Sequence, residues 1–236
     1  MTLKEIKIIL QKLGDQKRAE QSKRYFKTGP GQYGEGDIFW GIPVPELRKL
    51  SRAYRDIPLE TAAKLLKSPI HEERMLALLI LVLKYTKADA KEQKRIYTLY
   101  LKKTRFINNW DLVDLSAHYI VGPFLMDKSK KPLYRLAASK SLWERRIAIM
   151  ATFHFIRQNV YSETLKIAEV LISDQEDLIH KAVGWMLREV GKRDLQTEEE
   201  FLKPRYKDMP RTMLRYAIEK FPAAMRKRYL KGEIEQ

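Results

Sequence analysis

Apolar residues recur along this chain at the spacing of amphipathic helices, and alternating apolar and polar runs of strand length are absent. A Thr2-x-x-Glu5 capping box predicts a first helix, which stops at Gly14. A second helix is expected over about 15–27. Helix signals continue in this way to the end of the chain, so the sequence predicts an all-α fold.

One stretch interrupts the helices. Residues 28–45 hold five of the ten glycines and three of the ten prolines, which predicts a long ordered loop or crossover. Its segment 34–37, Gly-Glu-Gly-Asp, lacks the order of a phosphate-binding loop and follows no strand, so its expected role is structural. Prolines then suit the first positions of two further helices, over 45–54 and 58–67.

The rest of the chain repeats in structural terms. A charged residue followed by small and branched apolar residues recurs at intervals of 32 to 40 residues. The five copies begin at Arg74, Asp114, Arg146, Lys181 and Arg215. Such intervals are typical of one helix pair per repeat in an α-solenoid of HEAT-like or armadillo type. Capping boxes at Ser141-x-x-Glu144 and Thr197-x-x-Glu200 predict helix starts inside two of these units.

Stacking these repeats in register would give a curved superhelix with a concave basic groove. Four of the five repeat-defining charges are cations, and Asp114 is the exception. We expect a single domain over 1–236, with N-terminal helices and the Gly/Pro-rich loop in 1–45 and the repeats in 46–236.

Charge points to the class of partner. Lys and Arg total 46 against 30 Asp and Glu, a net charge of +16, which favours a polyanion such as nucleic acid. The cations are spread along the chain, which favours a long groove over a basic tail. With no cysteine and four scattered histidines, neither a thiol nucleophile nor a metal site or other cofactor is expected.

No apolar run reaches the roughly 18 to 20 residues that cross a bilayer, so we expect no membrane partner and a cytoplasmic, nucleoid-associated location. A monomer without an obligate protein partner is the plainer expectation.

The stretch 109–119 combines an aromatic ring with acids. Asn109 suits a helix N-cap, and Trp110 and Asp114 stand four residues apart, so both should project from one helix face. Asp111 is rotated about 100° from Trp110 and is expected to serve the positive end of the helix dipole. A carboxylate beside a Trp in so basic a protein is either a buried brace or the one negative group inside a cationic groove.

Three motifs in order decide between these readings: Trp110-Asp-Leu-Val-Asp114, Trp143-Glu-Arg-Arg146-Ile-Ala-Ile, and Lys181-Ala-Val-Gly-Trp185-Met-Leu-Arg188-Glu. Together they resemble the AlkD family of DNA alkylation repair glycosylases, over nearly the whole chain. The resemblance implies a curved stack of HEAT-like helix pairs that cradles duplex DNA and removes cationic N3- and N7-alkylpurines in base excision repair. Because no Lys is indicated as a nucleophile at the reaction centre, the expected enzyme is monofunctional and leaves an abasic site without cutting the strand.

The resemblance also assigns roles to residues. It implies that Asp114 is the catalytic carboxylate, that Trp110 and Trp185 face the lesion, and that Arg146 grips the DNA backbone nearby. Tyr25 matches an N-terminal aromatic that lies close to the DNA. Further candidates for backbone contacts are Lys181, Arg188, Arg215 and Arg74. The chain departs from the family pattern in its 28–45 loop and in carrying Asn109 where that pattern can have a second Trp.

Two other functions stay open on the sequence. One is a non-catalytic HEAT-repeat protein that binds damaged or branched DNA without excising a base. The other is a HEAT-type scaffold whose groove takes an acidic peptide. Excision of methylated purines would distinguish the enzyme from both, and a steep salt dependence of DNA affinity would exclude the scaffold.

Overall fold

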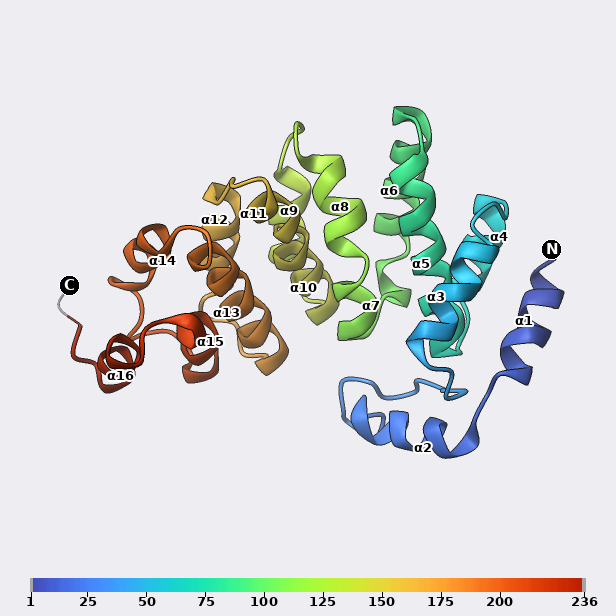
Figure 1. Ribbon diagram of the computed structural model, residues 1–236, viewed down its shortest axis with the longest axis horizontal. Helices are drawn as coiled ribbons and strands as arrows, with labels where there is room; N and C mark the ends of the chain where they lie inside the picture. The colour runs from blue at the N-terminus through green and yellow to red at the C-terminus, as the bar shows by residue number, and fades with distance from the viewer. Residues whose placement is uncertain (1, 235–236) are drawn as a thin grey trace. The chain divides into compact units, whose positions relative to one another are not determined.

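The computed structural model describes residues 2–234, which form helices joined by turns and loops (Figure 1). Within that range the one β interaction is an isolated parallel bridge between Ile38 and Ile70. The predicted all-α class is confirmed. The chain forms two compact units, Met1–Phe124 and Leu125–Gln236, which we describe separately.

The first unit is built around one long buried helix. α5 (His71–Lys87) is buried along its first three turns, and α3 (Val44–Ala53), α4 (Leu59–Leu65), α6 (Ala90–Lys102) and α7 (Trp110–Asp114) pack against it. The other elements of the unit are α1 (Leu3–Lys12), α2 (Gln16–Tyr25), η1 (Thr104–Phe106) and most of α8 (Ala117–Leu125). An apolar core on all sides of α5 explains why its sequence is hydrophobic almost all round.

Local signals place several of these helix ends. The capping box at the start of α1 is present, with the Thr2 hydroxyl accepting from the Glu5 N–H and the Glu5 carboxylate accepting from the Thr2 N–H. Pro58 is the N-cap of α4. α3 begins at Val44, one residue before the predicted Pro45, because Pro45 takes a first-turn position where its missing N–H costs nothing.

The 28–45 segment is an ordered crossover, held by one buried carboxylate. Glu72, at 4% exposure, accepts hydrogen bonds from the backbone N–H groups of Trp40 (3.0 Å), Gly41 (2.7 Å) and Ile42 (3.2 Å). Gly41 has φ of +78°, and a Cβ there would lie 2.2 Å from the Asp15 carbonyl oxygen, so only glycine fits. The loop is therefore fastened to the first turn of α5.

The second unit contains two rows of helices. α10 (Leu142–Ala151) packs on α13 (Asp177–Gly191), and α13 packs on α15 (Arg211–Ala217). α9 (Lys131–Ala137) packs on α10, α12 (Ser162–Val170) packs on α13, and α9 contacts α12. The remaining elements are α11 (Phe153–Arg157), α14 (Leu195–Leu202), η2 (Ile218–Lys220) and α16 (Ala223–Lys231). This is the packing expected of stacked helix pairs, while a continuous solenoid with a concave groove remains a prediction.

One predicted helix start in this unit is wrong. Ser141 caps α10 as expected, but α14 begins at Leu195 and its N-cap is Asp194, not Thr197. The Asp194 carboxylate accepts from the Thr197 N–H at 3.0 Å and from its hydroxyl at 2.6 Å. Thr197 thus occupies the third helical position, because an acceptor three residues upstream already satisfies its N–H.

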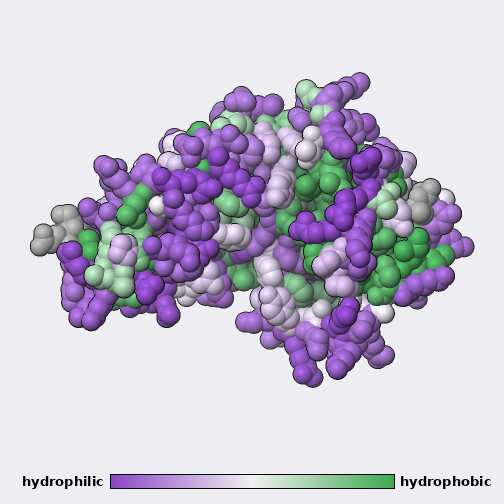
Figure 2. Space-filling model, viewed as in Figure 1, coloured by the Kyte–Doolittle hydropathy of each residue, from purple (hydrophilic) through white to green (hydrophobic). Residues whose placement is uncertain are grey.

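Polar side chains cover most of the face shown in Figure 2. Among the described residues, no helix combines the length and the apolar character that crossing a bilayer requires.

Candidate active site

The α7 helix is a single turn with Trp110 and Asp114 at its two ends. Asn109, fully buried and in extended backbone conformation, caps it by accepting the Trp110 N–H at 2.9 Å. Leu112 and Val113 are fully buried between those ends, whereas Trp110 and Asp114 are half-buried. The predicted N-cap is confirmed, and the two residues assigned to the chemistry keep partial access to solvent, as does Asp111 between them.

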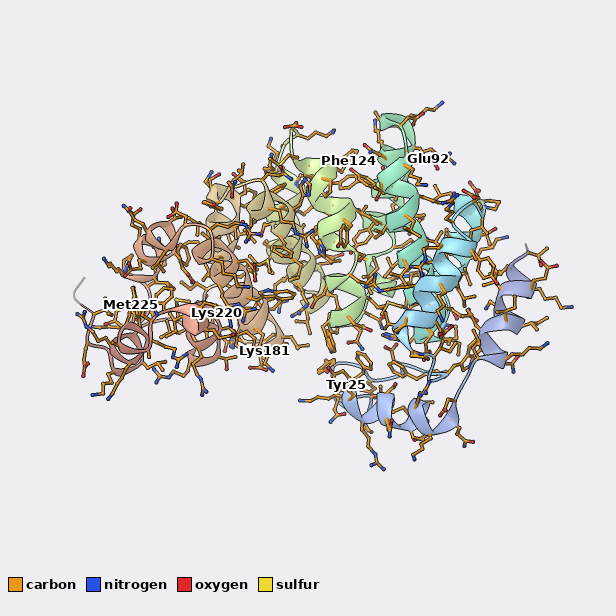
Figure 3. All side chains as sticks on the ribbon, viewed as in Figure 1. Tyr25, Glu92, Phe124, Lys181, Lys220 and Met225 are labelled. Atoms are coloured by element: carbon orange, nitrogen blue, oxygen red, sulfur yellow. The ribbon has the colours of Figure 1, made fainter. Side chains whose placement is uncertain are left out.

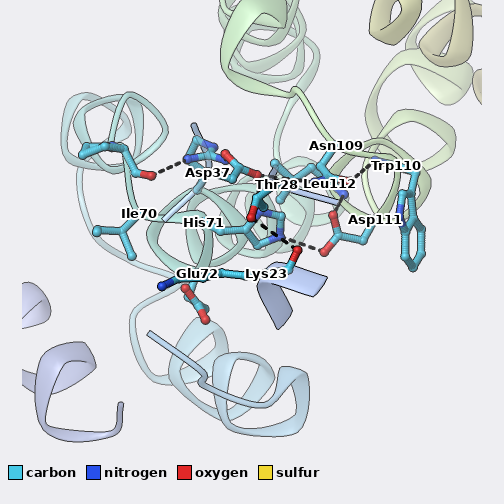
Figure 4. Close-up of polar contacts among 12 residues, drawn as sticks. Lys23, Thr28, Asp37, Ile70, His71, Glu72, Asn109, Trp110, Asp111 and Leu112 are labelled. Carbon is cyan, nitrogen blue, oxygen red and sulfur yellow. Dashed lines mark hydrogen bonds and ion pairs between the residues drawn. The ribbon is translucent and has the colours of Figure 1, made fainter. Parts of the chain in front are cut away.

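Asp111 has a second role beside the predicted one. One carboxylate oxygen accepts from the Leu112 N–H at 2.8 Å, in keeping with the expected place in the first turn of the helix. The other oxygen lies 2.8 Å from Nε2 of His71, on α5 (Figure 4). Asp111 is thus a bridge between α7 and α5.

His71 sits between two carboxylates. Its Nδ1 lies 3.0 Å from Oδ2 of Asp37, which comes from the crossover loop, and the histidine is only 2% exposed. Burial lowers the pKa of His71, but the charge of Asp111 and the hydrogen bonds to Asp111 and Asp37 outweigh it and raise that pKa to about 9. The imidazole is therefore charged at neutral pH.

Arg74 completes this buried cluster, which corrects one prediction. Its guanidinium pairs with Asp37 and donates to the backbone carbonyls of Ser68 (3.0 Å) and Pro69 (3.1 Å). At 3% exposure it cannot lie along a DNA backbone. Burial raises the pKa of the Asp37 carboxyl, yet hydrogen bonds and charges from His71 and Arg74 bring it below its ordinary value. Arg74 is a structural partner of the loop carboxylate.

Aromatic rings surround the indole of Trp110. Phe26 stacks on it with 5.3 Å between ring centroids, and Tyr25 meets it edge-on at 5.8 Å. Phe26 in turn stacks on Phe39 at 5.1 Å, and Phe39 stacks on His71 at 4.5 Å. Tyr25, labelled in Figure 3 at the end of α2, is 67% exposed. An exposed ring therefore adjoins the half-buried indole of Trp110.

The charge of Asp114 affects the pKa of a tyrosine, Tyr100. Tyr100 is fully buried and its hydroxyl lies 2.9 Å from that of Ser116. Burial raises the pKa of Tyr100, the Ser116 hydrogen bond opposes this, and the negative charge of Asp114 adds to the rise. The charge of Asp114 on α7 is therefore felt by the phenol of Tyr100 on α6.

The other predicted site residues belong to the second unit. Arg146 on α10 is 5% exposed and donates to the Leu178 carbonyl, which braces α10 against α13. Trp185 on α13 is half-buried, and its indole N–H donates to Glu189 at 3.3 Å. Arg188 pairs with Glu219. Arg146, like Arg74, is thus a buried structural cation rather than a backbone contact. Contacts of Trp185 and Arg188 with DNA stay predictions.

Two of the predicted DNA-contacting cations in this unit, Lys181 and Arg215, are accessible to solvent. Lys181 on α13 pairs with Asp177 at 2.7 Å across one helical turn, and its side chain is 40% exposed. Arg215 on α15 is exposed. Exposed cations on packed neighbouring helices suit contact with phosphates.

The sequence did not point to Phe26, Asp37, Phe39 or His71 as parts of this site. They come from the end of α2, the crossover loop and the start of α5, and no local spacing joins these three segments. The available signals were that Phe26 follows the predicted Tyr25 and that Asp37 ends the Gly-Glu-Gly-Asp run. Within residues 2–234, no group of three or more His, Asp or Glu side chains is placed to hold a metal ion.

Solved structures of other proteins share this fold. The fold resembles a structure described as a predicted DNA alkylation repair enzyme from Enterococcus faecalis, with a TM-score of 0.68 and 18% identity over 89% of this chain and 97% of that one. It also resembles AlkD2 from Streptococcus mutans, with a TM-score of 0.56 and 16% identity over 88% and 98% of the two chains. At such identities these likenesses show the fold.

A third solved structure, smu.31 from Streptococcus mutans UA159, aligns with a TM-score of 0.54 and 19% identity over 75% of this chain and 92% of that one. No curated protein sequence matches the chain. The family model described as DNA alkylation repair enzyme matches residues 6–221. The protein therefore belongs to the family of DNA alkylation repair enzymes.

Proposed function

We propose that this protein is a monofunctional DNA glycosylase that hydrolyses the N-glycosidic bond of cationic N3- and N7-alkylated purines in duplex DNA. Its family membership supports alkylation repair in general. The observation that carries the finer proposal is the α7 turn, which presents Trp110 and Asp114 half-buried at its two ends while everything between them is committed to packing or to His71.

The chemistry asks little of the enzyme at the base. An alkylated purine carries a positive charge, so it leaves as a neutral base with the electron pair of the broken bond and needs no general acid. The sugar carbon C1′ becomes oxocarbenium-like, and a carboxylate nearby stabilises that charge. Water then adds to C1′ and loses a proton, which the Asp114 carboxylate can accept.

The indoles supply selectivity. A cation over an aromatic face gains about 0.5 to 2 kcal/mol, a gain that a neutral, undamaged base does not receive. Phe26 stacks on the indole of Trp110 and Tyr25 meets it edge-on. These contacts fix the orientation of the indole before the damaged base binds. We assign the same role to Trp185 of the second unit.

For the DNA backbone we propose Lys181, Arg215 and Arg188 as cationic contacts, with Tyr25 beside the duplex; Arg146 is too buried to serve there. Lys181 and Arg215 are the best placed of these because they face solvent. Arg188 would have to exchange its Glu219 partner for a phosphate.

Asp114→Asn tests the proposal. The substitution keeps the shape of the side chain and removes its charge, so release of N7-methylguanine from duplex DNA should fall by about a hundredfold or more while the dissociation constant for DNA changes little. Asp56→Asn, at a position whose side chain is 89% exposed, is the matched control and should retain full activity.

Equal activity of Asp114→Asn and the wild type would refute the catalytic assignment. Binding to methylated duplex with no base released by the wild type would favour a non-catalytic reader of damaged or branched DNA.

A further inference from the structure

The buried ionic cluster beside α7 holds two positive and two negative side chains. His71 contacts Asp37 through one ring nitrogen and Asp111 through the other, and Arg74 pairs with Asp37. Each ring nitrogen faces a carboxylate oxygen, so both must donate, which only the imidazolium can do. With His71 charged, the cluster is neutral overall.

This cluster supplies polar attachments between α7 and the rest of the unit, beside the packing of the buried Leu112 and Val113. A helix of five residues has too few internal hydrogen bonds to be stable alone. Its cap, Asn109, reaches Asp37 at 3.4 Å, and its second residue, Asp111, reaches His71 at 2.8 Å. Both polar attachments of the first turn therefore lead to the same two residues, Asp37 and His71.

The ring of His71 also supports the indole. Phe39 stacks on His71 with an interplanar angle of 24°, and Phe26 lies 5.1 Å from the imidazole and 5.3 Å from Trp110. Asp111 and Trp110 are adjacent residues, so one imidazolium sets the backbone of this turn through a hydrogen bond and its indole through stacked rings.

We propose that His71, as the imidazolium between Asp37 and Asp111, is a positioning residue that orients α7 and thereby aims Trp110 and Asp114 at the damaged nucleotide. The proposal rests on the glycosylase function proposed above. His71 does not touch substrate in this scheme. Misplacing a reacting group by about 1 Å can cost about a hundredfold in rate, which is the order of effect expected from losing this attachment.

The arrangement predicts loss of function on the alkaline side. The charged groups that contact His71 are Asp37 from the loop and Asp111 from α7, and Arg74 on its own helix pairs with Asp37. Because the folded pKa of about 9 lies above the ordinary 6.5, the stabilisation is complete below about 6.5 and is lost as pH rises to and through 9. Neutral His71 can donate to only one of the two carboxylates, so either Asp37 or Asp111 loses its histidine donor.

Two variants test this inference by independent routes. His71→Gln carries its N–H donors on a single nitrogen and places a carbonyl oxygen where the second ring nitrogen was, so it cannot hold both carboxylates as the imidazolium does. Its single-turnover excision rate should therefore fall by about tenfold or more with DNA affinity preserved. Asp111→Asn keeps the side-chain size but removes one of the charges that hold the proton on His71, so it should move the alkaline loss of activity to lower pH. His154→Gln, at a half-buried histidine of α11, is the matched control and should keep both the rate and the pH profile.

Two measurements need no substrate. NMR titration should show the His71 ring holding its proton to about pH 9 in the wild type and losing it earlier in Asp111→Asn. Hydrogen exchange at neutral pH should show faster exchange of the α7 amides in His71→Gln, with the α13 amides unchanged.

The outcomes separate this inference from the glycosylase proposal. A wild type that releases no methylated base, but whose ring titration and α7 exchange behave as stated, refutes the glycosylase and leaves His71 as the support of α7. If the wild type is active and both His71→Gln and Asp111→Asn keep its excision rate and its alkaline pH profile, the positioning role is refuted.

Discussion

Two buried carboxylates, Asp37 and Glu72, hold the 28–45 loop of the first unit in place. Asp37 accepts from His71 and Arg74, and Glu72 accepts three backbone N–H groups of the crossover loop. Both residues are under 10% exposed. A buried carboxylate is stable only with such partners, so these two acids tie the loop to α5 more firmly than loop packing alone would.

Glu72→Gln should therefore destabilise the fold. The amide keeps one acceptor but turns an N–H group toward the loop's own donors, at a cost of about 2 to 3 kcal/mol in the free energy of unfolding. Chemical denaturation measures this. Glu60→Gln, where the side chain is 70% exposed, should change the free energy of unfolding by only about a few tenths of a kcal/mol or less. A Glu72 variant as stable as the Glu60 variant would mean that the loop does not depend on this carboxylate.

Which residues could be predicted follows from the distance over which their contacts act. Asn109, Trp110 and Asp114 were recognisable because caps and helix faces are local. His71 was not, because its partners lie 34 and 40 residues away in a loop and another helix. Arg74 was placed in the groove by repeat register alone, which carries no information about a carboxylate arriving from the loop.

At the scale of the helices, α1, α7 and α10 begin where the sequence predicts, because one side-chain acceptor caps each of them. α14 shows the exception, since Asp194 and Thr197 both offer a side-chain oxygen and the upstream carboxylate wins. The packing of α13 on α15 depends on a small residue, which periodicity does not reveal. A Cβ on Gly184 would lie 2.4 Å from the Met213 carbonyl and 2.6 Å from Cβ of Tyr216.

Gly184→Ala should push these two helices apart. Backbone atoms of α15 cannot move without disturbing the buried row, so a loss of about 1 to 3 kcal/mol in stability is expected, despite alanine's better helix propensity. Thermal unfolding measures this. Gly29→Ala provides the same change where the nearest atom, 3.1 Å away, ends the flexible Gln32 side chain, and it should be nearly neutral. An unchanged melting temperature for Gly184→Ala would show that the α13–α15 contact is not close-packed.

For the chain as a whole, the net charge of +16 and the family together lead us to expect DNA binding dominated by phosphate contacts. Composition could predict this because it needs only a count. Which cations of each unit contact the DNA could not be predicted in the same way, since that depends on packing between helices that no single motif encodes.

Arg215→Ala should weaken DNA binding uniformly across sequences and reduce the slope of log affinity against log salt by about 0.9, the value of one phosphate contact. Fluorescence anisotropy over a salt series measures both. Arg95→Ala is the control, because that guanidinium already pairs with Glu60 and Glu92, and it should leave the slope unchanged. If both variants keep the wild-type slope, Arg215 lies off the DNA path.

The most direct test of the whole account is to incubate the wild-type protein with randomly methylated duplex DNA and identify the purines released. We expect N7-methylguanine and N3-methyladenine as free bases, with the strand left uncut at the abasic sites. DNA that is bound but yields no methylated purine would contradict the account, because Trp110 and Asp114 would then have no leaving base to act on.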